Sequence, residues 1–125
     1  MTDHPADANG EEDVDLREIA RQLVSRLGPT LVAALAGATA KEQAIEWAKP
    51  DGPEPPPDAA RRLELAHRAW TAVAASEGDD VARAWFIGYN PLLGDHHLPL
   101  TAILDDRATE VMAAVRAFLE DRPDV

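Results

Sequence analysis

The feature that most constrains the fold is a helical spacing of apolar residues, interrupted at short intervals by glycine and proline. Leu16, Ile19, Leu23 and Leu27 are separated by three or four residues, so they share one face of a helix. Gly28 and Pro29 end that helix, and Pro29 is suited to begin the next. No short stretch alternates apolar and polar residues with the β-branched or aromatic enrichment of a strand. The chain is therefore expected to be all-α, a compact helical domain of about six to seven helices.

Similar patterns and capping residues predict the remaining helices. The expected helices cover residues 16–27, 30–36, 39–48, 58–76 and 81–87, a short helix opened by Pro99, and a last helix opened by Asp106 or Thr109. Thr39 and Glu42 fit a capping box. Asp58, and then Asp79 or Asp80, are placed to cap two later helices. The run Pro53–Pro57 predicts a stiff, extended spacer before the longest helix.

Length and composition favour one cytoplasmic domain with a tail. The chain has 125 residues and no cysteine, which excludes disulfides and thiolate chemistry. No apolar run is long enough to span a membrane, and no secretory signal is expected. Residues 1–14 are predicted to be a disordered acidic tail, with an acidic arm that mimics nucleic acid as the alternative. Residues 15–76 form a helix-turn-helix-like region and residues 77–125 a second helical region.

The net charge of −11 opposes DNA binding by the free chain. Even so, residues 30–36, a turn at Gly37, and residues 39–48 have the proportions of a helix-turn-helix. An ordinary helical hairpin is the alternative, since Glu42 and Glu46 offset the lysines of the second helix. The candidate DNA-binding residues are Lys41, Gln43, Lys49, Arg61 and Arg62.

The segment between residues 81 and 104 carries more large apolar residues than a solvated connector needs. It must pack on its own domain or on a partner. Trp47 and Trp70 are expected in the core, because both lie on apolar stripes, whereas Trp85 lies beside the apolar loop. The pair His96-His97 lacks the spacing of a metal site, so no metal and no cofactor are expected.

The same segment contains a motif of known type, made of Trp85, Asn90, Pro91, Leu93, Gly94, Pro99 and Leu100. It resembles the C-terminal toxin-binding region of Xre/MbcA/ParS-type antitoxins, over roughly Leu23 to Leu119. The resemblance implies an Xre-like helix-turn-helix core followed by a toxin-binding region. It also implies a cognate RES-type toxin that degrades NAD and whose active site the antitoxin obstructs. The weakly basic second helix and the proline-rich spacer depart from the family pattern.

The sequence thus predicts a type II antitoxin that neutralises a RES-type toxin and can repress its own operon. The alternative is a stand-alone helix-turn-helix regulator. Enzyme motifs are absent, so the chain is not expected to be an enzyme. Operator DNA is a second expected partner, and a homodimer is expected because operators are palindromic, with residues 16–27 as the dimerising helix. The predicted toxin-binding residues are Trp85, Tyr89, Asn90, Pro91, Leu92, Leu93, Gly94, His97, Leu98, Pro99 and Arg116.

Overall fold

The computed structural model describes residues 15–96 and 98–120 and is all-α, as predicted. The described residues form seven α-helices and one 3-10 helix, with no strand. The elements are α2 (Leu16–Leu27), α3 (Pro29–Ala36), α4 (Lys41–Trp47), α5 (Pro57–Glu77), α6 (Asp79–Ile87), η1 (Pro91–His96), α7 (Pro99–Leu104) and α8 (Ala108–Glu120). The predicted tail, residues 1–14, lies outside the described residues. No helix among the described residues is both long and apolar enough to cross a membrane.

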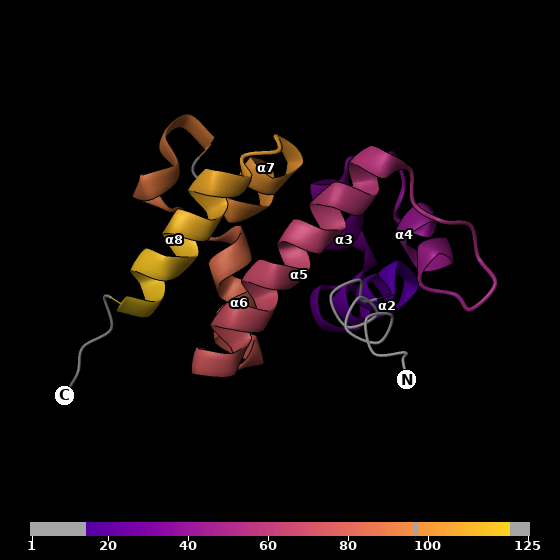
Figure 1. The fold of residues 1–125 in the computed structure, drawn as a ribbon, viewed down its shortest axis with the longest axis horizontal. Helices are drawn as coiled ribbons and strands as arrows, with labels where there is room; N and C mark the ends of the chain where they lie inside the picture. The colour runs from indigo at the N-terminus through magenta and orange to yellow at the C-terminus, as the bar shows by residue number, and fades with distance from the viewer. Residues whose placement is uncertain (1–14, 97, 121–125) are drawn as a thin grey trace, which may run out of the picture.

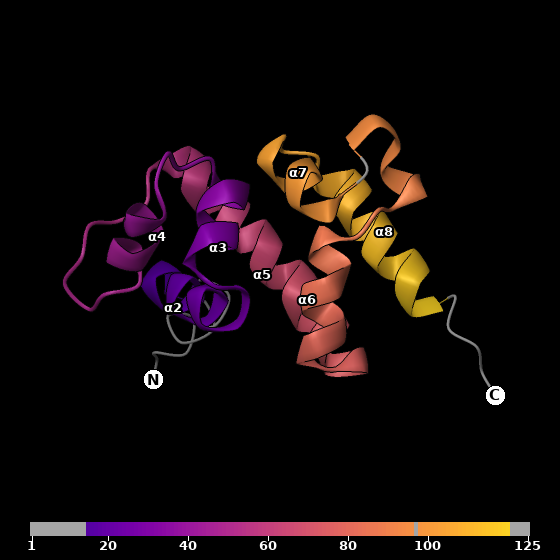
Figure 2. The same ribbon diagram turned by 180° about the vertical axis from the view of Figure 1, so that it is seen from behind.

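Helix α5 runs through the middle of the molecule and separates two groups of helices (Figure 1). Helices α2, α3 and α4 lie toward one end, and α6, α7 and α8 lie toward the other, an arrangement that the reverse view repeats (Figure 2). Helix α5 packs against α2, α3, α6, α7 and α8. Helices α3 and α7 also contact each other across the division. The two predicted regions on either side of residue 76 therefore share one helix and one interior.

The buried apolar residues form one continuous core. Its largest fully buried side chains are Phe86, Leu23, Leu35, Leu63, Ile103, Val32, Val73, Val111 and Pro99. They come from both ends of the molecule and from α5. Trp47 and Trp70 are buried with 4% and 7% of their surface exposed, which confirms the prediction that both belong to the core.

Several helix boundaries agree with the sequence prediction for identifiable reasons. Helix α2 spans Leu16–Leu27 as expected, and the Asp15 carboxylate accepts a hydrogen bond from the Arg17 amide in its first turn. Helix α3 ends at Gly37, which has φ +85° and ψ +19°. This left-handed conformation favours glycine, and it lets the Gly37 and Ala38 amides donate to the Ala33 carbonyl.

The predicted caps of three helices are wrong. Helix α4 begins two residues later than expected, at Lys41 with Ala40 as its N-cap, so Thr39 and Glu42 do not form a capping box. The Gln43 side chain instead accepts hydrogen bonds from the Thr39 and Ala40 amides, at 2.8 and 3.2 Å. Gln43 is the third residue of the helix, and its side chain satisfies two backbone amides that precede the helix.

The other two corrections move an aspartate from the cap into the first turn. Helix α5 begins at Pro57 rather than Asp58, because proline tolerates the first helical position, where no amide partner is needed. Helix α6 has Gly78 as its N-cap, with Asp79 and Asp80 inside the first turn. There the carboxylates still complement the helix dipole without capping it. The last helix begins at Ala108, between the two expected positions.

The proline-rich segment folds back on the domain at its start. The Gly52 carbonyl accepts a hydrogen bond of 3.1 Å from the Arg17 guanidinium, and Pro55 is buried. A side chain at Gly52 is excluded, because a Cβ there would lie 1.9 Å from the Glu46 carbonyl oxygen. Residues 53–56 carry no helix, as predicted for a spacer, whereas Pro57 belongs to α5.

Candidate functional site

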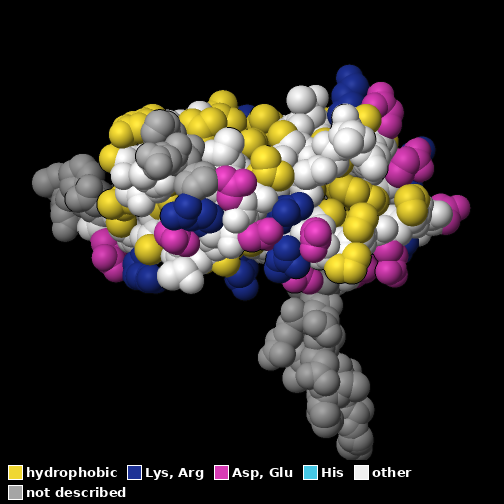
Figure 3. Space-filling view, turned by 90° about the horizontal axis from the view of Figure 1, so that it is seen from above, with side chains coloured by type: hydrophobic (Ala, Val, Ile, Leu, Met, Phe, Trp, Pro, Cys, Tyr) yellow, Lys and Arg dark blue, Asp and Glu magenta, His cyan; other side chains and the backbone are white. Residues whose placement is uncertain are grey.

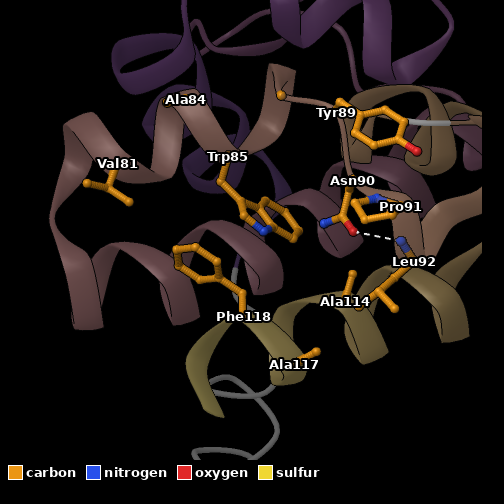
Figure 4. Close-up of a pocket in the computed structure, with 11 residues that line it drawn as sticks. Val81, Ala84, Trp85, Tyr89, Asn90, Pro91, Leu92, Ala114, Ala117 and Phe118 are labelled. Atoms are coloured by element: carbon orange, nitrogen blue, oxygen red, sulfur yellow. Dashed lines mark hydrogen bonds between the residues drawn. The ribbon is translucent and has the colours of Figure 1, made fainter. Parts of the chain in front are cut away.

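An apolar groove of about 610 Å³ lies between α6, η1 and α8 (Figure 4). Its lining residues are Val81, Ala84, Trp85, Gly88, Tyr89, Asn90, Pro91, Leu92, Ala114, Ala117 and Phe118. Helix α6 and the turn that follows it supply one wall, and α8 supplies the other. Hydrophobic side chains also gather on the surface at this end of the molecule (Figure 3).

Small residues line the two helical walls, and aromatic residues lie between them. Ala84 lies on α6, and Gly88 follows one turn later, directly after the end of that helix; Ala114 and Ala117 are one turn apart on α8. The rings of Trp85 and Phe118 lie 6.5 Å apart at an angle of 57°. Trp85 also meets Phe86 edge to face at 5.3 Å, which anchors its indole to the core. The small side chains leave the groove open, while the aromatic rings give it an apolar base.

The Asn-Pro turn sets the direction of the two leucines that follow it. The Asn90 side-chain oxygen accepts from the Leu92 amide at 3.1 Å, and the Asn90 carbonyl accepts from the Leu93 amide at 3.0 Å. Asn90 thus caps η1. Asparagine is common at such turns, because its side chain can accept a hydrogen bond from the backbone amide two residues further on. As a result, adjacent leucines point in opposite directions: Leu93 is 3% exposed and Leu92 is 60% exposed.

Gly94 breaks η1 with a backbone conformation that requires glycine. Its φ of +61° and ψ of −129° lie in a region that other residues essentially do not occupy. A Cβ at this position would meet nothing within 4 Å, so the backbone alone demands glycine. This break divides η1 into two parts, and α7 begins after it, at Pro99.

Two side-chain donors in the groove, on Trp85 and Asn90, have no acceptor among the described residues. The indole Nε1 of Trp85 is buried and has no hydrogen-bond partner among the described residues. The whole residue is 8% exposed. Buried indole N–H groups usually find a partner, and leaving one unmade is unfavourable. The side-chain nitrogen of Asn90, a half-buried residue, donates to no other described residue.

The structure brings together about half of the predicted toxin-binding residues. Trp85, Tyr89, Asn90, Pro91 and Leu92 line the groove. Leu93 and Pro99 are buried in the core instead, and Leu98 is half-buried. Gly94 and Arg116 are exposed but outside the lining, and His97 lies outside the described residues.

Sequence reasoning missed the rest of the lining: Val81, Ala84, Gly88, Ala114, Ala117 and Phe118. Alanine and glycine carry no chemical signal of their own, and Phe118 belongs to the apolar stripe of the last helix. One signal was available, since small residues recur one turn apart on two helices. Only the packing of α6 beside α8 shows that these two stripes face the same space.

The candidate DNA-binding residues on α4 and in the turn after it are exposed, but the side chains of Gln43 and Lys49 are already engaged within the chain. Helices α3 and α4 pack against each other, as expected of either a helix-turn-helix or a hairpin. The Gln43 side-chain oxygen serves the start of α4, and the Lys49 ammonium pairs with Glu46 at 2.9 Å. Lys41 is exposed.

The other two candidates, Arg61 and Arg62, pair with Asp106 in the turn before α8. The nitrogen–oxygen distances are 3.1 Å for Arg61 and 3.0 Å for Arg62. Arg62 also donates to the Ala36 carbonyl, at 3.1 Å. The hydrogen bond from Arg61 lowers the pKa of Asp106, and the same bond raises the pKa of Arg61. Basic and acidic side chains alternate across the middle of this face, so little net positive potential is available for phosphate (Figure 3).

A polar network outside the groove joins α2 to α5. The Gln22 side chain donates to Glu18 at 2.9 Å, and its oxygen lies 2.9 Å from the His67 ring nitrogen. Hydrogen bonds from Arg21 and Gln22 lower the pKa of Glu18 to about 2. Burial lowers the pKa of His67, against a smaller opposite effect of the Glu18 charge.

Comparisons of the chain with protein-family models, with curated proteins and with solved structures gave no match.

Proposed function

We propose that this chain is the antitoxin of a type II toxin–antitoxin pair and that it binds a RES-type, NAD-degrading toxin through the groove. The observation that carries the proposal is the coincidence of two features. The segment that resembles the toxin-binding region of Xre/MbcA/ParS-type antitoxins also forms one wall of the apolar groove. Tyr89 and Leu92, both within that segment, are 69% and 60% exposed.

Exposed apolar side chains around a groove are typical of protein-binding surfaces. Leu92 is held outward by the Asn90 cap and is not simply unpacked. The acidic balance of the C-terminal part, with nine acids and four arginines after Gly78, suits a toxin whose site binds an anionic dinucleotide. Inhibition would be steric, with the bound antitoxin covering the toxin's substrate cleft.

Co-expression with the RES-domain protein of the same host tests the proposal. The wild-type chain should restore growth and cellular NAD, and Leu92→Asp and Tyr89→Asp should each fail to do so. Thr71→Asp places the same charge at an exposed position of α5 and should still neutralise the toxin. If both groove variants remain folded and protective, the groove is not the toxin-binding surface.

A second proposal, repression of the operon through α4, is supported by the exposed outer face of that helix. It is opposed by the net charge of −11 and by the ion pairs of Lys49, Arg61 and Arg62. A gel-shift titration of the chain against its own promoter, with and without the toxin, tests it. Binding only in the complex fits an antitoxin, and binding by the free chain favours a stand-alone regulator.

A further inference from the structure

The unpartnered polar atoms of the groove are both hydrogen-bond donors. Among its lining residues only Trp85, Tyr89 and Asn90 have polar side chains. Trp85 presents Nε1 and Asn90 presents its side-chain nitrogen, while the Asn90 oxygen is occupied by the Leu92 amide. Tyr89 already has an interaction within the protein. In Figure 4 the Asn90 nitrogen lies on the Trp85 side of its amide.

We infer that the groove binds an extended apolar segment of the partner, whose backbone carbonyl oxygens accept hydrogen bonds from Trp85 and Asn90. The inference depends on the proposed function, since it specifies the part of the toxin that is bound. Interior carbonyls of a helix are already used within the helix. An extended or polyproline II segment keeps its carbonyls free, and grooves lined by aromatic residues are a known way to bind such segments.

The shape of the surface favours a polypeptide over a small ligand. Val81, Tyr89 and Leu92 line the groove, yet they remain 40%, 69% and 60% exposed. A small molecule in the groove would leave much of that apolar surface in water, whereas a segment that continues past Leu92 would cover it. Strand addition is not an available mode here, because the described residues include no strand edge.

Reaching the indole nitrogen requires a local movement. Nε1 of Trp85 is buried, and Figure 4 shows the Phe118 ring alongside the nitrogen-bearing edge of the indole. Phe118 is half-buried and lies in the last turn of α8. An incoming carbonyl therefore displaces the Phe118 ring and gains a hydrogen bond that the free protein leaves unmade. A buried indole N–H without an acceptor raises the free energy of the unbound protein. Binding of the partner removes this penalty and is favoured by it.

Selection of displayed random dodecapeptides on the full chain provides the test. Enriched sequences are synthesised with blocked ends and titrated into ¹⁵N-labelled protein, with the three tryptophan indole resonances as reporters. We expect peptides without helical periodicity that shift the Trp85 indole resonance and leave Trp47 unmoved. Asn90→Asp keeps the oxygen that caps η1 but removes the donor. The substitution should weaken peptide binding about threefold to tenfold, because one hydrogen bond is lost. The new carboxylate also repels the carbonyl oxygen of the peptide.

Trp85→Phe removes the second donor and should weaken binding by a similar factor. Thr109→Asp adds a charge to exposed α8 surface outside the groove lining and should leave peptide affinity unchanged. Thermal unfolding of each variant shows whether it is folded. If Asn90→Asp binds the peptide more weakly but melts at the wild-type temperature, the lost donor is the cause and the turn is intact.

Three results would overturn the inference. Selection could yield no groove-binding peptide, or only amphipathic helical peptides that leave the Trp85 indole resonance unmoved. The Trp85 indole resonance could shift when the free chain is diluted. That result would show that a second copy of the chain occupies the groove. If toxin neutralisation depends on Leu92 while no extended peptide binds, the antitoxin proposal stands and only this inference fails.

Discussion

The two ends of the molecule differ in how much large apolar surface they leave exposed. At the end formed by α2, α3 and α4, side chains that could contact a partner are engaged within the chain: Gln43 with the start of α4, Lys49 with Glu46, and Gln22 with His67. At the end formed by α6, η1 and α8, an indole N–H and an amide nitrogen lack acceptors, and Tyr89 and Leu92 remain exposed. Buried donors without a partner are not confined to this end, since Nε of Arg17 on α2 and Nε of Arg62 on α5 also lack one. The exposed large apolar side chains of the described residues, however, all lie on α6, on η1 or in the turn between them, so this end is the better candidate for a partner.

The adjacent leucines of η1 give the strongest test of this contrast. Leu93→Ala should lower the free energy of unfolding by about 2–5 kcal/mol, the usual cost of truncating a buried leucine. Leu92→Ala should change it by only about 0.5 kcal/mol or less, because Leu92 is 60% exposed. Urea denaturation measures both. Equal destabilisation by the two variants would mean that Leu92 packs within the domain and is not free for a partner.

The break at Gly94 should be the next most sensitive position. Gly94→Ala should cost about 1–3 kcal/mol from backbone strain, since a Cβ meets no neighbouring atom. Gly94→Asn should cost as much, because a ψ of −129° lies outside the left-handed helical region that asparagine tolerates. Thermal melts of both variants check this. If asparagine restores wild-type stability, the conformation at Gly94 differs from the one described.

Release of the paired arginines would sharpen the comparison at the other end. Asp106→Asn removes the charge that holds Arg61 and Arg62 and should destabilise the fold by about 1 kcal/mol or less, as for exposed ion pairs. The freed arginines should raise non-specific DNA affinity at low salt. Urea denaturation and a gel shift at two salt concentrations measure these effects. Unchanged DNA affinity would indicate that these arginines do not face nucleic acid.

The smallest effect is a dependence of stability on pH. His67 has a lowered pKa in the folded protein, so the unfolded chain binds its proton first, and stability should fall as the pH drops below about 6.5. The pKa of Glu18 is lowered to about 2 in the folded protein, so the stability that its carboxylate contributes is lost as the pH falls from 4.5 to 2. His67→Gln should flatten the melting temperature between pH 7 and 5, and Glu18→Gln should flatten it only in the lower range. A slope that survives in His67→Gln would assign it to another group.

The sequence by itself determined the helices and their order. Apolar spacing and the Gly28-Pro29 and Gly37 signals fixed α2 and α3, because local backbone preferences and one-sided hydrophobicity act within a few residues. The same reasoning placed Trp47 and Trp70 in the core. It also found the motif from Trp85 to Leu92, since large apolar residues in a loop need a packing partner.

Only the tertiary structure decided which of those residues act together. Adjacent Leu92 and Leu93 look alike in sequence, and the hydrogen bonds of Asn90 send one outward and the other into the core. Arg61 and Asp106 lie 45 residues apart, so their pairing depends on how α5 meets the turn before α8. The groove likewise exists because alanines on α6 and α8 face one space. The sequence does not distinguish alanines that line a groove from other alanines, because only the packing of the helices determines what these small side chains face.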